Sequence, residues 1–147
     1  MKFSIALYQP EIPQNVGTIL RLAACMDIAV HLIEPFGFVW HEPKLRRAGM
    51  DYIDNVEVIR HDSWESFKQA NPHKQLVLLD VDGTGSIYKH QFLNEQILIS
   101  GRESDGVPDN IKKDCYASIH IPMPGKGRSL NVAIATAIAV ATAIPQL

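Results

Sequence analysis

The sequence predicts an α/β fold in which a mostly parallel sheet lies between helices. Short β-rich runs alternate with helical patterns along the whole chain, an order typical of parallel strands joined by helical crossovers. Two runs, at 75–81 and 96–100, are almost continuously apolar, as expected of strands covered on both faces. The chain has 147 residues and no repeat or low-complexity linker, so residues 1–147 are expected to form a single domain.

The elements of the first half follow from caps and periodicity. Asn15 is expected to cap a helix that continues to about Met26, because asparagine is a favoured N-cap and apolar residues follow at helical spacing. Ser63 is expected to cap the helix "WESFKQA", with Glu65 in its first turn. Strands are expected at 3–8, 30–33 and 56–60, and a short helix at 43–48.

The second half continues the alternation. Strands are expected at 75–81, 96–100 and 116–122, with a short helix from Pro108 to Asp114. The final helix is expected to start at Ser129, within "GRSLNVAIATAIAVA" at 127–141, which has no charge after Arg128. This segment approaches the length of a membrane span. However, it is mostly alanine and threonine and lacks flanking aromatic residues, so a buried helix is favoured.

Composition excludes several function classes. With a formal net charge of −2, the chain has no overall positive charge that would indicate nucleic-acid binding. Cys25 and Cys115 form no C-x-x-C pair, and the six histidines are scattered singly. We therefore expect no disulfide framework and no metal site, and a cytoplasmic, reducing environment. A G-x-G-x-x-G motif is absent, which argues against a dinucleotide site.

The stretch "LLDVDGTG" at 78–85 offers one alternative function. A strand that ends in D-x-D-G-T is similar to the nucleophile motif of the haloacid-dehalogenase phosphatases, in which Asp80 would attack phosphorus, Asp82 would move a proton and Mg²⁺ would be required. That family carries the motif on its first strand and needs a later acidic pair. The residues after Thr84 offer no paired aspartates after a strand, so a turn of Asp and Gly after a buried strand is favoured.

Three other segments form a more specific set. "NVGTILR" at 15–21 carries Gly17 early in a helix, where glycine costs about 0.5–1 kcal/mol relative to alanine, so a close approach is expected there. "ISGRESDGVP" at 99–108 places glycines around Glu103 directly after a core strand. "IPMPGKGRSLN" at 121–131 is a bent loop that ends in polar side chains at a helix start.

In this order and spacing, the three segments resemble the three motifs of the SPOUT RNA methyltransferases of the TrmH/SpoU superfamily. The match is narrower still to the small TrmL/YibK branch, and "YQPEIPQNVGTILRLAA", "LIEPFGF" and "LRRAGMDY" extend it over essentially the whole chain. The resemblance implies an α/β fold with a deep trefoil knot in its carboxyl-terminal part, and a homodimer. It also implies S-adenosylmethionine as cofactor, and transfer of its methyl group to the ribose 2′-hydroxyl of the wobble nucleotide, a cytidine or uridine, in the anticodon loop of leucine tRNAs.

The same resemblance implies the roles of individual residues. Arg21 would activate the ribose hydroxyl, and Asn15 would steady Arg21. Glu103, Ser129 and Asn131 match the remaining catalytic motif positions. The expected cofactor-binding residues are Leu79, Gly101, Glu103, Ile121, Met123, Ser129 and Leu130.

Local basic clusters are the expected RNA contacts. These are Lys44, Arg46 and Arg47 in "KLRR", together with Lys126 and Arg128. The chain departs from frequent family residues at Asp80-Val81-Asp82, at Arg102 in place of proline and at Ala133 in place of serine. A non-catalytic RNA-binding protein with the knot fold stays open as a third hypothesis beside the enzyme and the phosphatase.

Overall fold

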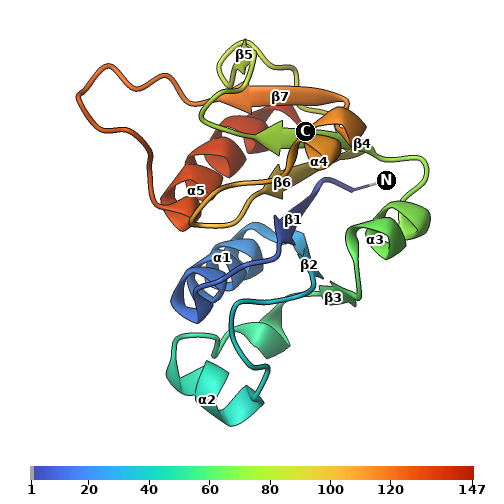
Figure 1. Cartoon of the computed structure of the whole chain (residues 1–147), viewed down its shortest axis with the longest axis vertical. Coiled ribbons are helices and arrows are strands. Elements are labelled where there is room, and N and C mark those ends of the chain that lie inside the picture. The colour runs from blue at the N-terminus through green and yellow to red at the C-terminus, as the bar shows by residue number, and fades with distance from the viewer. Residues whose placement is uncertain (1) are drawn as a thin grey trace.

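The computed structural model describes residues 2–147, which form one seven-stranded sheet with helices on both faces (Figure 1). The strand order is β3-β2-β1-β6-β4-β7-β5, and every strand pairing among these residues is parallel. The expected α/β class with a parallel sheet is therefore confirmed. The strands are β1 (Ser4–Tyr8), β2 (Ala29–Ile33), β3 (Val58–His61), β4 (Gln75–Leu79), β5 (Gly85–Ser86), β6 (Gln96–Ser100) and β7 (Ala117–His120).

The helices divide the hydrophobic core between the two faces of the sheet. Side chains of β1 alternate between the faces, as the period of a strand requires: Ile5 and Leu7 pack with α1 and α5, whereas Ala6 and Tyr8 pack with α3 and α4. The helices are α1 (Pro13–Met26), α2 (Glu42–Arg47), α3 (Trp64–Ala70), α4 (Asp109–Asp114) and α5 (Val132–Ala143), with 3-10 turns at Ile53–Asn55 and Ile144–Gln146. No helix within residues 2–147 has the length and apolarity to cross a bilayer.

Two predicted helix starts are wrong. The first helix begins at Pro13 rather than after Asn15, and its N-cap Ile12 makes no side-chain cap bond. Proline suits the first turn of a helix because its missing N–H is not needed there. The last helix begins at Val132, since the Asn131 side chain, not Ser129, accepts hydrogen bonds from the first-turn amides.

Other boundaries differ by a few residues. The predicted strand at 75–81 ends at Leu79 because the amide of Gly83 donates to the carbonyl of Asp80 and turns the chain. The strand predicted at 56–60 is Val58–His61, and the two-residue β5 was missed. Strand Gln96–Ser100 and the Ser63 cap are confirmed.

The close approach expected at Gly17 is made by another part of the protein backbone. A Cβ atom on Gly17 would lie 2.3 Å from the carbonyl oxygen of Gly49. The residue is therefore glycine because the segment after α2 packs directly against α1. What approaches this helix is the backbone of the chain itself, not a ligand.

Two buried histidines join β2 to β3. His31 Nδ1 and His61 Nε2 lie 2.9 Å apart, and the rings stack with centroids 5.1 Å apart. Phe67 of α3 meets both rings edge-on. Burial, the neighbouring His61 and the more distant Lys74 lower the pKa of His31 from 6.5 to about 4, and burial lowers the pKa of His61 too. The pair is therefore neutral in the folded protein at neutral pH.

We predict that the protein loses stability as the pH falls below 6.5. The unfolded chain binds a proton at His31 between pH 6.5 and 4, whereas the folded chain does not, so protons favour unfolding in this range. The free energy of unfolding should drop by about 2 kcal/mol between pH 7 and pH 5 from His31 alone. Denaturant titrations of the wild type and of His31→Gln, which keeps a neutral polar side chain, measure the difference. Equal pH dependence in the two proteins would contradict it.

Candidate functional site

A cavity of about 670 Å³ opens at the carboxyl ends of β4 and β6, beside the amino ends of α1 and α5. Its walls are residues 79–82, 100–107 and 128–132, together with single residues from neighbouring loops and helices. Parallel α/β sheets bind ligands outside the carboxyl ends of their strands. The volume falls within the range of about 300–1,000 Å³ that is usual for small-molecule sites.

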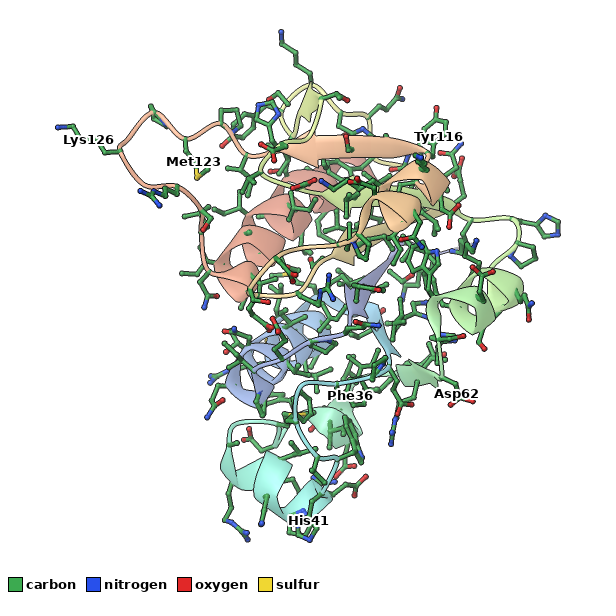
Figure 2. The ribbon with its side chains drawn as sticks, viewed as in Figure 1. Phe36, His41, Asp62, Tyr116, Met123 and Lys126 are labelled. Atoms are coloured by element: carbon green, nitrogen blue, oxygen red, sulfur yellow. The ribbon has the colours of Figure 1, made fainter. Side chains whose placement is uncertain are left out.

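All of the predicted cofactor-binding residues line this cavity. Figure 2 shows Met123 on the loop that joins β7 to α5, and this loop forms one side of the cavity. The three segments that the sequence analysis singled out therefore line one cavity, although the role of each residue stays a prediction. The lining includes Leu79, Gly101, Glu103, Ile121, Met123, Ser129 and Leu130.

Asn131 ties the first and last of these segments together. Its Oδ1 accepts hydrogen bonds from the amides of Ala133 and Ile134, at 2.8 and 3.2 Å, and so caps α5. Its Nδ2 donates to Asn15 Oδ1 at 3.0 Å, across 116 positions of sequence. One side chain therefore fixes the start of α5 and places it against the first turn of α1. Both asparagines line the cavity.

Glu103 anchors its loop through a reciprocal clamp with Glu11. The amide of Glu11 donates to Glu103 Oε2 at 2.8 Å. In return, the amide and hydroxyl of Ser104 donate to the Glu11 carboxylate at 2.9 and 3.0 Å. Charge-assisted bonds of this kind are stronger than neutral ones. No local pattern in the sequence distinguished Glu11 as part of the site.

Arg21 does not reach this cavity within its own chain. It is exposed on α1, and its guanidinium carbon lies 5.3 Å from the centre of the Tyr52 ring. Neither residue lines the cavity. The expectation that Arg21 converges with the other catalytic candidates is therefore not met in a single chain.

The predicted RNA contacts lie in two separate regions. Lys44, Arg46 and Arg47 belong to α2, where Arg46 is paired with Asp54 at 2.8 Å. Lys126 projects from the loop before α5, whereas α2 lies at the opposite end of the molecule (Figures 1 and 2). Of the predicted RNA contacts, Arg128 lines the cavity.

Charged side chains of both signs surround the cavity. Asp80, at the end of β4, pairs with Lys112 of α4 at 3.1 Å. The hydrogen bond from the Lys112 ammonium to Asp80 raises the pKa of Lys112. Asp82 and Asp105 also line the cavity. Within residues 2–147, no group of three or more histidine, cysteine, aspartate or glutamate side chains could hold a metal ion.

We predict that Glu11→Ala loosens the wall of the cavity. The substitution removes the acceptor of the Ser104 amide and one of the two acceptors of its hydroxyl. A lost hydrogen bond of about 1 kcal/mol corresponds to about fivefold faster exchange of the Ser104 amide. Hydrogen–deuterium exchange over residues 101–106 measures this effect. Glu57→Ala, which removes an exposed glutamate from another loop, is the control. Unchanged exchange in Glu11→Ala would show that the clamp does not hold the loop.

Sequence relatives match over nearly their full lengths. The chain is 43% identical over 145 residues to the tRNA (cytidine(34)-2′-O)-methyltransferase of Beijerinckia indica, covering 97% of this chain and 91% of that protein. It is 38% identical over 146 residues to the enzyme of the same name from Escherichia coli, covering 98% and 93% of the two chains.

Solved structures of RNA methyltransferases resemble this chain over nearly its whole length. A structure from a study of 2′-OH methylation at C/U34 of tRNA has a TM-score of 0.92 at 40% identity, covering 99% of this chain and 95% of that one. An AdoMet-bound rRNA methyltransferase from Sinorhizobium meliloti has a TM-score of 0.87 at 25% identity, covering 99% of this chain and 57% of that one. The α/β knot fold expected from the resemblance is confirmed by these structures.

The model of the SpoU rRNA Methylase family matches residues 2–141. This match covers the cavity and all three segments that form its walls. It favours the methyltransferase hypothesis over the phosphatase alternative, in which Asp80 would be a nucleophile. The chain therefore belongs to the SpoU methylase family.

Proposed function

We propose that the protein transfers a methyl group from S-adenosylmethionine to the ribose 2′-hydroxyl of the wobble nucleotide, cytidine or uridine 34, in the anticodon loop of leucine tRNAs in the cytoplasm. The observation that carries the proposal is the single cavity into which three distant segments converge. Relatives at 38–43% identity bear the name of this activity.

The cavity fits the methyl donor chemically. S-adenosylmethionine supplies an electrophilic methyl group on a sulfonium, and it carries an adenine, an ammonium and a carboxylate. Leu79, Ile121 and Leu130 offer apolar surface for a flat base. The carboxylates of Asp82 and Asp105 suit a cationic ligand, and Arg102 provides a positive charge beside them. Family members bind this cofactor, as the AdoMet-bound structure from Sinorhizobium meliloti shows.

The protein's task at the ribose is to help the hydroxyl lose its proton while the methyl group arrives. A guanidinium placed at that oxygen stabilises its developing negative charge. A guanidinium keeps its proton in proteins, so it acts by its charge rather than as a base. Glu103 is positioned by the backbone amide of Glu11, which donates to its Oε2 at 2.8 Å.

We infer that Arg21 serves the cavity of a second copy of the chain. Helix α5 has no charged residue and no polar face, and a helix that is apolar all round is normally covered. Ile134 of α5 is nevertheless 54% exposed, and Met26 of α1 is 45% exposed. Because α1 and α5 pack together, a two-fold contact over this face would cover both helices and bring Arg21 of one copy towards the other.

RNA would lie across the two copies. The exposed cations Lys44 and Arg47 of α2 suit phosphate contacts, and Arg128 stands at the cavity itself. A dimer doubles these patches, which compensates for a chain whose net charge is −2. Binding through phosphates weakens as salt rises, because each contact releases condensed counterions.

We predict that Arg21→Ala lowers the rate of methyl transfer to tRNA by about 10²–10³-fold, the usual contribution of one group that stabilises developing negative charge. Affinity for S-adenosylmethionine should not change, because the proposed role of Arg21 is at the ribose hydroxyl rather than at the cofactor. Single-turnover assays with labelled methyl donor and calorimetry measure the two quantities. Lys113→Ala, which removes an exposed positive charge elsewhere on the surface, is the control. Full activity of Arg21→Ala would remove Arg21 from the mechanism.

A mixture of two inactive variants distinguishes the two placements of Arg21. Gly101→Ala should disrupt the wall of the cavity, because the new Cβ would lie 2.7 Å from the Cα of Gly106. If Arg21 serves the partner, heterodimers of Arg21→Ala with Gly101→Ala contain one complete site and regain activity. If it serves its own chain, the mixture stays inactive. A wild type that binds tRNA but transfers no methyl group would instead support the non-catalytic hypothesis.

We predict that Ile134→Glu yields a folded monomer. The side chain is half exposed in one chain, so the charge should cost the monomer little, whereas at a covered interface an unpaired ion costs several kcal/mol. Sedimentation at micromolar concentration measures the association. Val39→Glu, at an 84% exposed site outside this face, should stay dimeric. A dimer that survives Ile134→Glu would place the interface elsewhere.

A further inference from the structure

Arg102 is the least exposed of the cations that line the cavity. Its side chain is 24% exposed, compared with 39% for Lys112, which is already paired with Asp80. Arg128, the third, lies in the exposed loop before α5. Arg102 thus stands inside the wall of the cavity, between Gly101 and Glu103, and the mechanism proposed above gives it no part.

The Arg102 side chain is held in one position by the loop around it. Its backbone forms an isolated bridge with Gly106, with both N–H···O bonds at 3.0 Å. Its Nε donates to the Gly106 carbonyl at 3.1 Å and lies 3.0 Å from Asp105 Oδ1. The guanidinium carbon lies 5.5 Å from the centre of the buried Tyr8 ring, a distance typical of a cation–π contact.

These contacts use one edge of the guanidinium and leave the other edge available. Both Asp105 and Gly106 interact with Nε, and neither Nη atom has a hydrogen-bond partner within residues 2–147. The two Nη atoms carry four N–H groups in a planar fork, the geometry that matches the two oxygens of a carboxylate. A fork that is fixed before the ligand arrives loses little conformational freedom on binding.

We propose that Arg102 binds the carboxylate of the methyl donor and so positions its amino-acid end. This inference rests on the proposed function. A small ligand suits the partly buried place of Arg102 in the wall of the cavity. An RNA phosphate suits Arg128 better, because that residue stands on the exposed loop. Asp105 is 66% exposed, so solvent screens its charge and leaves the fork attractive to an anion.

Calorimetry with two ligands tests the proposal. S-adenosylmethionine and its decarboxylated form differ only in the carboxylate. The wild type should bind the first more tightly, and Arg102→Met should weaken it by about 10–100-fold, as for a lost charge-assisted contact. Binding of the decarboxylated ligand should stay within about twofold of wild type, which also shows that the variant's cavity is intact. Lys89→Met, which removes an exposed cation that does not line the cavity, is the control and should leave the affinity for both ligands unchanged.

Arg102→Lys keeps the charge but lacks the fork, so it should lose part of the preference for the carboxylate. If Arg102→Met does not fold, the comparison of the two ligands is made with Arg102→Lys instead. Equal weakening of both ligands would assign Arg102 a structural role and overturn the proposal. Unchanged affinity for S-adenosylmethionine would overturn it as well, including when tRNA binding falls instead. A wild type that binds neither ligand would contradict the proposed function, whereas a wild type that binds both equally contradicts only this inference.

Discussion

The parallel pairing of the strands is the constraint on which the site depends. Parallel register brings the carboxyl ends of β1, β6 and β4 to one edge of the sheet, and the segments that follow them must meet there. The hydrogen bond between Asn131 and Asn15 then closes this edge with the starts of α1 and α5. Distant segments become neighbours because of the topology, and a small number of amide and carboxylate contacts fixes their spacing.

Sequence patterns predicted the parts of this architecture that depend on local chemistry. The apolar run Gln96–Ser100 predicts a strand, and Ser63 predicts the start of a helix. Both predictions are confirmed by the structure. The start of α5 was misplaced because Ser129 and Asn131 are both good caps. Only the tertiary contact with Asn15 selects Asn131. Similarly, Gly17 indicated a close approach, but the pattern could not show that Gly49 is the neighbour.

Motif spacing identified the cavity lining but could not place long charged side chains. Arg21 belongs to the motif and lies outside the cavity of its own chain. Arg102 departs from the motif, and the structure places it in the wall. The Glu11 clamp depends on two loops separated by more than 90 positions. Such roles are set by which loops meet in the folded chain.

The central claim is that this cavity directs a methyl group to one ribose oxygen. The most direct measurement is to incubate the wild-type protein with labelled S-adenosylmethionine and unmodified leucine tRNA, then to map the label by nuclease digestion and mass spectrometry. We expect one methyl group per tRNA, on the 2′-oxygen of nucleotide 34. A label on a base, at another nucleotide, or absent from tRNA despite cofactor binding would contradict the claim.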